Sequence, residues 1–320
     1  MDGLLVVDKP VGPTSHDVVA RVRRALGERR VGHTGTLDPA ASGILPLVLG
    51  RATRLARFLS SSDKDYEAVV RLGVATDTYD KEGVPVGPPY QGPLPSREAV
   101  ESALAAFRGA FMQRPPAYSA KKIGGQRSYR LARIAAGARH VPGTCQVGAR
   151  HVPGTGTPVE VKTPEPSLVS ASAIEIIATS GDTVTLSVTC SAGFYVRSLA
   201  HDLGARLGIG AHLAGLRRTR CAEFTAGDAV SLDDLDRDPS AARARVVPLA
   251  AMLPGLPAVV LTDEGVQFLA HGRAIGPAQM IERREGAGPS VRLIGGGGEL
   301  LGVAEPAATP GFLHPAVVLM

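Results

Sequence analysis

The sequence predicts an α+β protein whose C-terminal part is a small β-rich domain. Strand-like segments alternate along the chain with segments whose apolar residues have helical spacing. Two strand-like segments, Ala173–Ile177 and Thr183–Cys190, flank the turn residues Ser180-Gly181-Asp182, which predicts an antiparallel hairpin. After Pro254 the composition changes to short strands and glycine-rich turns. With 320 residues, the chain is long enough for one large domain and one small one.

The other elements follow from the same patterns. Thr14 or Ser15 can cap a helix whose apolar residues have helical spacing and which ends at Gly27. The clearest helix begins at Ser96 and ends at Phe107, and Arg114-Pro115-Pro116 prevents its continuation. The remaining predicted elements are strands at 4–7, 66–74, 213–224, 259–261 and 291–294, helices at 54–59 and 198–207, and an acidic helix or linker at 228–238.

The charge of the chain is concentrated in one block. A formal net charge of +5 and a pI near 9.3 permit an acidic partner without showing one. Between Gly109 and Val159, however, eight residues are Lys or Arg and none is Asp or Glu. Such a block fits a surface that follows a phosphate backbone.

Cysteine usage and the N-terminal residues predict a cytoplasmic protein. Cys145, Cys190 and Cys221 lie far apart and form no CxxC pair, so we expect reduced thiols. The apolar run Gly3–Val7 lacks the basic start, the long apolar region and the cleavage site of a signal peptide, and is predicted to be a strand. No apolar run is long enough to predict a membrane span.

One stretch, Val31–Leu55, combines glycines, hydroxyls, His33 and Asp38 with an apolar second half. Pro39 disfavours a helical conformation at Asp38, which places the carboxylate in an extended loop. The apolar run Gly43–Gly50 predicts a buried element that fixes this loop to the core. A carboxylate held beside a core segment is a candidate catalytic group, and the alternative is a turn in which Asp38 caps a backbone amide.

Other chemistries lack their motifs. The glycine run Gly295–Gly298 opens no helix and carries no Lys-Ser/Thr, so it predicts a turn and not a phosphate loop. Ala40 stands where an Asp-x-Asp nucleophile needs its second acid, and the chain has no Gly-x-Ser-x-Gly elbow. The chain has no His-x-x-x-His pair, so the sequence gives no indication of a metal site. The sequence Ala-Arg-His-Val-Pro-Gly-Thr occurs at 138–144 and again at 149–155, which we interpret as a duplication in a surface loop.

Five motifs then occur in a fixed order. They are Gly32–Pro46, Asp65-Tyr66-Glu67-Ala68, 114–122 (Arg-Pro-Pro-Ala-Tyr-Ser-Ala-Lys-Lys), 193–197 (Gly-Phe-Tyr-Val-Arg) and 216–220 (Leu-Arg-Arg-Thr-Arg) followed by Phe224. Together with Asp8-Lys9-Pro10 near the start, this order resembles the TruB family of pseudouridine synthases over about 220 residues.

The resemblance implies a pseudouridine synthase fold with a central mixed, largely antiparallel sheet. It implies a catalytic domain at 1–250 with an RNA-clamping insertion at about 109–158, and a small PUA-like domain at 255–320. The implied reaction converts the uridine at position 55 of the tRNA T-loop to pseudouridine, without a cofactor or metal. The enzyme would be a cytoplasmic monomer that needs no protein partner. Two alternatives remain: a guide-RNA-dependent synthase subunit, and a non-catalytic module that binds or folds tRNA.

The same resemblance implies roles for individual residues. Asp38 would be the nucleophile, and Arg197 would pair with it. Tyr66, the third implied catalytic residue, would stack on the extruded base and assist proton removal. His33 would take part in base flipping. The other residues implied to hold the substrate are Tyr195, Leu216, Lys9, Lys121, Lys122, Arg127 and Arg130. For the last four, a solvated basic face is also what backbone binding requires.

Overall fold

The computed structural model describes residues 1–119, 121–123, 126–129 and 164–320, with backbone alone at 122–123 and 126–127. The chain folds as two compact units. One unit comprises Met1–Ser62 together with Arg218–Met320, and the other comprises Asp63–Arg217. Each unit is built on mostly antiparallel strands with helices packed against them, which confirms the predicted α+β class.

The N-terminal strand organises the sheet of the first unit. It pairs antiparallel with β3 over its whole length, with Val7 opposite Leu45, and pairs parallel with a short later strand. Every residue of β1 except Asp8 is buried, so the strand is a core element that supports the neighbouring loops. The strands of this sheet are β1 (Gly3–Lys9), β2 (Val31–His33), β3 (Ala41–Leu49), β12 (Val230–Ser231) and β13 (Val247–Pro248), with β11 (Phe224–Thr225) pairing the end of β10 (Ala211–Cys221).

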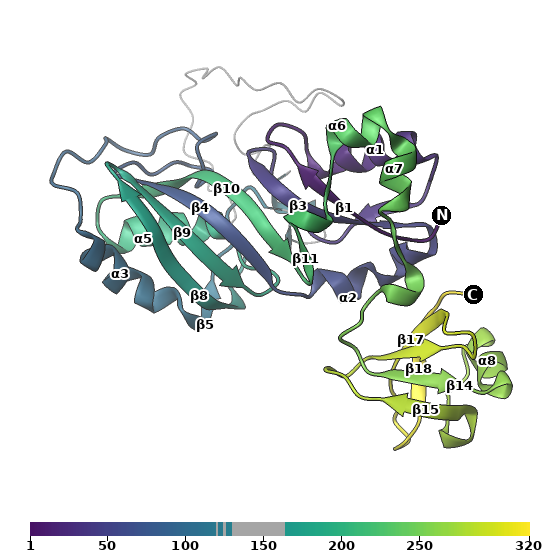
Figure 1. Ribbon diagram of the computed structural model, residues 1–320. Helices are drawn as coiled ribbons and strands as arrows, with labels where there is room; N and C mark the ends of the chain where they lie inside the picture. Colours follow the sequence, from purple (N-terminus) through teal and green to yellow (C-terminus); the bar gives the residue numbers. More distant parts are fainter. Residues whose placement is uncertain (120, 124–125, 130–163) are drawn as a thin grey trace. The chain divides into compact units, whose positions relative to one another are not determined.

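The first helix confirms the sequence prediction. In α1 (Ser15–Leu26), Thr14 is the N-cap and forms a capping box with Asp17, and Gly27 ends the helix in the left-handed conformation with φ 65°. The helices α6 and α7 lie beside α1 (Figure 1). The further helical segments of this part are α2 (Ala56–Ser60), α6 (Leu232–Arg237), α7 (Pro239–Ala244), and the 3₁₀ turns η1 (Gly50–Leu55), η3 (Ala226–Asp228) and η4 (Leu249–Ala251).

The second unit is a sheet with the strand order β4-β9-β8-β5. The predicted hairpin is confirmed, because β8 and β9 pair antiparallel around Gly181, whose φ is 55°. Residues of α3 and α5 share an apolar core with this sheet (Figure 1). The elements are β4 (Lys64–Leu72), α3 (Arg97–Leu104), η2 (Ala105–Phe107), β5 (Gly109–Gln113), β6 (Lys122–Ile123), β7 (Gln126–Arg127), β8 (Ser167–Ser180), β9 (Thr183–Cys190) and α5 (Val196–Arg206).

The strand β5 was not predicted, and neither were the two-residue strands β6 and β7. The helix that begins after Ser96 ends well before Arg114-Pro115-Pro116, and β5 intervenes. Gly109 has φ 75°, a conformation that turns the chain away from the helix. The following residues then pair with β8, which is longer than its predicted core of 173–177 and offers a free edge.

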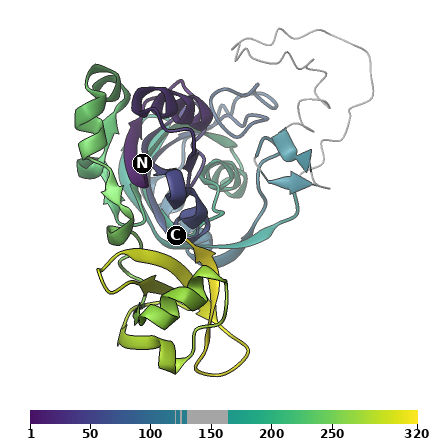
Figure 2. The same cartoon turned by 90° about the vertical axis from the view of Figure 1, so that its right-hand side faces the viewer.

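The C-terminal residues form a five-stranded sheet with the order β15-β14-β16-β17-β18, which confirms the small β-rich domain. Figure 2 shows this domain in light green and yellow. The helix α8, capped by Thr262, was not predicted there. The elements are β14 (Ala258–Leu261), α8 (Asp263–Ala270), η5 (Pro277–Gln279), β15 (Met280–Arg284), β16 (Val291–Ile294), β17 (Leu300–Pro306) and β18 (Leu313–Val318). Among the described residues, no helix has the length and apolar character that crossing a bilayer requires.

Candidate active site

Asp38 lies in the loop between β2 and β3, outside any helix or strand, as Pro39 predicts. Backbone hydrogen bonds fix the loop on both sides of the carboxylate. The amide of Ala41 donates to the carbonyl of Asp38 at 3.0 Å, and the amide of Gly12 donates to the carbonyl of Pro39 at 2.9 Å. The side chain is half-buried. The carboxylate is therefore presented from a loop whose main chain is held in place.

Ser15 anchors this loop by a reciprocal pair of hydrogen bonds. Its hydroxyl donates to the carbonyl of Leu37 at 3.0 Å and accepts from the amide of Leu37 at 2.9 Å. Leu37 is itself buried, so the residue before Asp38 is held by both its backbone and its side chain. The sequence identified Ser15 only as a possible helix cap. Because Thr14 makes the cap, the Ser15 hydroxyl remains available for the loop.

Lys9 supports the same region from the end of β1. It is fully buried, and its ammonium donates to the carbonyls of Pro10 and Pro13, both at 2.8 Å. Burial lowers its pKa to about 8, while the negative charge of Asp38 acts in the opposite direction. Lys9 therefore holds the turn that follows β1 and places a positive charge near the Asp38 loop.

Lys9 makes the stability of the protein depend on pH in the alkaline range. Its pKa is about 8 when folded and near 10.5 when exposed, so between these values the unfolded chain binds the extra proton. We expect the free energy of unfolding to rise by about 2.5 kcal/mol between the two pKa values, relative to Lys9→Met. Urea unfolding of both proteins across this range measures the difference. Parallel pH profiles for the two proteins would contradict the assignment.

Arg197 is held in the second unit, in the first turn of α5. It is almost completely buried, with its Nη1 at 3.4 Å from the carboxylate of Asp80 and at 3.3 Å from the carbonyl of Thr78. Its Nη2 donates to the carbonyl of Tyr118 at 2.9 Å. A buried guanidinium needs such partners to offset its loss of hydration. The planar group is thus fixed in orientation by two segments that precede it by more than seventy residues.

Asp80 is a site residue that sequence reasoning missed. Its Oδ1 accepts from the hydroxyl of Thr78 at 2.6 Å and from the amide of Glu82 at 3.0 Å, which leaves Oδ2 to face Arg197. The hydroxyl of Thr76 donates to the Asp80 carbonyl at 2.7 Å. The spacing Thr-x-Thr-x-Asp was the available signal, because hydroxyls two and four residues before an acid can order its turn.

The turn that carries Asp80 is fixed to the same helix as Arg197. Tyr79 adopts φ 67°, which is uncommon for a residue other than glycine, and its ring stacks on His201 of α5 with centroids 3.8 Å apart. The turn and the helix therefore form one rigid piece in which the Arg197–Asp80 pair is embedded.

The other predicted residues of this unit lie around its core. Tyr66 stands opposite Val188 in the β4–β9 pair, and both Tyr66 and Leu216 are partly buried against the apolar core. Tyr195 precedes α5, and its backbone exchanges two hydrogen bonds with the buried side chain of Gln113 at 2.8 and 3.0 Å. Gln113 was not identified from the sequence.

Most of the predicted RNA-contacting residues lie within the described part of the chain, and Arg130 lies outside it. His33 ends β2, is half-buried, and has its ring centroid 5.5 Å from that of His16. Lys121 donates to the carbonyl of Glu165 at 3.2 Å. Lys122 and Arg127 stand opposite each other in the β6–β7 pair. Arg130 and the duplicated segment at 138–155 lie outside the described residues.

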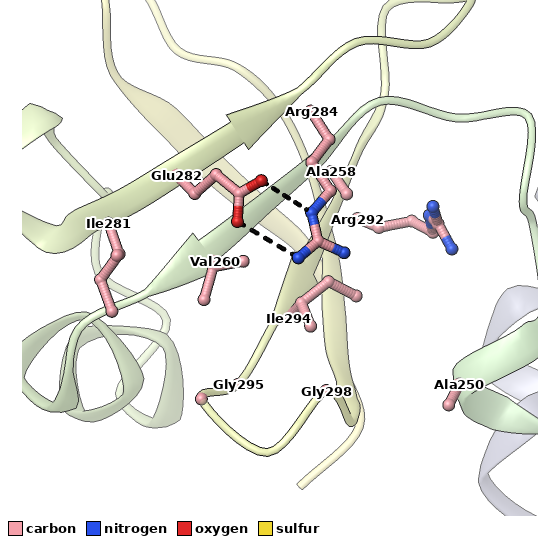
Figure 3. A pocket seen from close by; sticks show the side chains of 11 residues that line it. Ala250, Ala258, Val260, Ile281, Glu282, Arg284, Arg292, Ile294, Gly295 and Gly298 are labelled. Carbon is pink, nitrogen blue, oxygen red and sulfur yellow. Dashed lines mark hydrogen bonds and ion pairs between the residues drawn. The ribbon is translucent and has the colours of Figure 1, made fainter.

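A separate cavity of about 410 Å³ lies in the C-terminal sheet, beside the turn Gly295–Gly298 (Figure 3). Glu282 and Arg284 pair at its wall with 3.1 Å between Oε1 and Nε. The Nε of Arg292 is buried there without a hydrogen-bond partner among the described residues. None of the predicted site residues lines this cavity, so it is not part of the Asp38 region.

Each unit presents polar groups that are held in place. The first unit presents a carboxylate on a fixed loop with a buried lysine near it. The second presents a buried arginine oriented by an acid, together with Tyr66 at the border of an apolar core. Fixed carboxylates, fixed cations and aromatic surfaces are groups that take part in chemistry on an extruded nucleotide.

Comparisons with known proteins identify the family of the chain. Residues 23–149 match the model of the TruB family pseudouridylate synthase N-terminal domain, and residues 197–254 match that of the tRNA pseudouridylate synthase B C-terminal domain. A tRNA pseudouridine synthase B of Solibacter usitatus is 41% identical over 100% of both chains. The protein of that name from Thermobifida fusca is 41% identical over 99% of this chain and 98% of its own.

Solved structures agree at the level of the fold. A protein in an H/ACA RNP bound to a substrate RNA containing 2′-deoxyuridine superposes with a TM-score of 0.70 at 25% identity, covering 99% of this chain and 85% of that one. A chain of a Cbf5-Nop10-Gar1 complex gives a TM-score of 0.69 at 26% identity, with the same two coverages. The resemblance seen in the sequence is therefore confirmed, and the chain belongs to the TruB family of tRNA pseudouridine synthases, which are isomerases.

Proposed function

We propose that this enzyme converts the uridine at position 55 of the tRNA T-loop to pseudouridine, with Asp38 as the nucleophile. The observation that carries the proposal is the Asp38 loop, whose main chain is held by Ser15, Gly12 and Ala41. A carboxylate held in this way keeps one position while a nucleotide enters and turns. The motif Gly32–Pro46, which the resemblance in the sequence assigns as catalytic, includes this loop.

The reaction is an isomerisation, so its bonds balance within the substrate. The bond from N1 of uracil to C1′ of the ribose breaks, the base turns, and C5 forms the new bond to C1′. Tyr66 assists removal of the proton from C5, and N1 takes up a proton, so the number of protons in the base is unchanged. The carboxylate of Asp38 supplies the nucleophile.

Residues of the second unit receive the remaining roles in the proposal. Arg197 pairs with Asp38 during the reaction, and Asp80 limits how the guanidinium can turn because it holds one side of it. Tyr66 stacks on the extruded base, and Tyr195 and Leu216 line the uridine pocket. His33 fills space in the T-loop when the base leaves.

Basic residues outside the catalytic groups bind the RNA backbone in this proposal. They are Lys121, Lys122, Arg127 and Arg130, in an insertion at about 109–158 that grips the T-arm. The 255–320 module is a PUA-like domain. Lys9, which is buried, contributes by supporting the turn after β1 and not by reaching a phosphate. The enzyme acts in the cytoplasm as a monomer and needs no cofactor.

The test uses the purified protein alone with an unmodified T-arm stem-loop. Chemical modification followed by primer extension maps the product, and we expect one pseudouridine, at position 55. A stem-loop with cytidine at that position is the matched control and yields none. Product at another position would refute the site assignment.

The same experiment separates the alternatives. A guide-RNA-dependent subunit would modify the stem-loop only after a guide RNA and partner proteins are added. A non-catalytic module would bind the stem-loop and leave every uridine unchanged. Either result would contradict the proposed function.

A further inference from the structure

Arg218 is the largest fully buried side chain among the described residues. It lies in β10, with 1% of its surface exposed. Its Nε donates to the carbonyl of Ile44 at 2.6 Å, and its Nη2 donates to the carbonyl of Gly35 at 3.1 Å. A cation is expensive to bury, so its partners indicate what it is there to hold.

Both acceptors belong to the segment that carries Asp38. Gly35 lies three residues before the carboxylate, just after β2, and Ile44 lies six residues after it, in β3. The two carbonyls therefore bracket the loop. The guanidinium is planar and rigid, so two of its nitrogens fix the separation and the direction of the two carbonyls together. A lysine ammonium is a single centre on a flexible stem and lacks this constraint.

The main chain of Arg218 holds the same loop. Gly43 has φ 107°, and a Cβ at this position would overlap the carbonyl oxygen of Arg218. The backbones of the two residues are therefore in direct contact, next to the side-chain bond to Ile44. This contact leaves the C-terminal end of the loop no freedom to move toward β10.

The charge of Arg218 also acts in this region. Lys9 senses the negative charge of Asp38 and the positive charge of Arg218, so these three groups lie within electrostatic reach of one another. We propose that Arg218 is a positioning residue for Asp38: its buried guanidinium ties Gly35 to Ile44 and thereby sets where the carboxylate lies. This inference rests on the proposed role of Asp38.

The test compares Arg218→Lys with wild type under single turnover, with enzyme in excess over the T-arm stem-loop. A displacement of about 1 Å at a reacting group costs about a hundredfold in rate. We expect a loss of that size in the rate constant, with the RNA dissociation constant unchanged. If the role of Arg218 were purely structural, Arg218→Lys would lower the fraction of enzyme that is folded, and with it the maximum amount of RNA bound. The single-turnover rate constant of the folded fraction would then equal that of wild type. That result, or a wild-type rate, would overturn the inference.

Arg243→Lys is the matched control. Arg243 lies in α7 of the same unit, and its guanidinium also donates to a backbone carbonyl, that of Leu26 at 2.9 Å. We expect the wild-type rate for this variant. Arg218→Gln is the second variant, because it is neutral and its amide can reach only one carbonyl. It covers the case in which Arg218→Lys does not fold, and circular dichroism identifies the folded samples. A folded Arg218→Gln with the wild-type rate would also overturn the inference.

Asp38→Asn is measured in parallel and keeps the two proposals apart. If Asp38→Asn is as active as wild type, the proposed function fails whatever Arg218 does. If Asp38→Asn is inactive and folded Arg218→Lys has the wild-type rate, only the positioning role fails.

Discussion

We expect Asp38→Asn to abolish pseudouridine formation and to leave RNA binding intact. Asparagine has nearly the same size as aspartate but no nucleophilic oxygen, and the loss of a nucleophile costs about 10⁴-fold or more in rate. The loop keeps its shape, because Leu37, Asp38 and Pro39 are held through their backbone groups. Single-turnover formation of pseudouridine gives the rate, and filter binding to the T-arm stem-loop gives the affinity.

The control for this prediction is Asp233→Asn. It removes the same charge from an exposed carboxylate of α6, in the same unit, and we expect wild-type activity. Two outcomes would contradict the role of Asp38. One is an Asp38→Asn enzyme with substantial activity, and the other is a loss of activity that follows a parallel loss of RNA affinity.

Gly43→Ala is expected to be the most destabilising small substitution in the Asp38 region. The position has φ 107°, which L-residues rarely adopt, and the added methyl would overlap the backbone of Arg218. The backbone of Arg218 cannot move away by a rotamer change as a side chain can, so β3 and β10 would have to separate locally. We expect a loss of about 4 kcal/mol or more in the free energy of unfolding, from the strain and the overlap together.

Gly12→Ala separates these two causes. Gly12 has a similar φ of 115°, but no heavy atom lies within 4 Å of the position that a Cβ would take. Its amide still donates to Pro39 as alanine. We expect this variant to lose about 1–3 kcal/mol, from backbone strain alone. Urea unfolding measures both variants. Equal losses would show that the contact with Arg218 contributes nothing.

Local signals in the sequence were sufficient for much of the fold. The helix α1 was predicted because a cap, an apolar stripe and a terminal glycine coincide, and β8–β9 because a turn separates two alternating segments. β5 was missed because its formation depends on the edge of β8, which is distant in sequence. Propensity within a short window carries no information about such a partner.

In the candidate site, too, some residues can be identified from their neighbours in sequence and others depend on distant partners. The loop position of Asp38 could be predicted because its own neighbours, Pro39 and the apolar run that became β3, define a loop beside the core. Its role as the nucleophile came only from the resemblance of Gly32–Pro46 to the family motif. Asp80 and Gln113 could not be assigned, because each acts through a residue far along the chain: Arg197 and Tyr195. Their spacing in sequence has no periodicity that would connect them.

Arg218 shows a further limit of sequence reasoning. Arg217, Arg218 and Arg220 lie close together in the sequence, yet the middle one is buried. Alternation along a strand predicts that Arg217 and Arg218 point to opposite faces. It cannot tell which face is covered, because that depends on the loop with which Arg218 forms its bonds.

The adjacent hydroxyls of Thr14 and Ser15 have different substitution tolerance. Thr14 caps α1 from the surface, so serine, aspartate and asparagine can replace it and keep the helix. Ser15 is buried and both donates to and accepts from Leu37, a combination that neither carboxylate nor alanine can reproduce. In a library of random variants selected for pseudouridine formation, position 14 would therefore be diverse and position 15 nearly invariant. Two neighbouring positions with similar hydroxyl side chains would thus tolerate very different sets of substitutions.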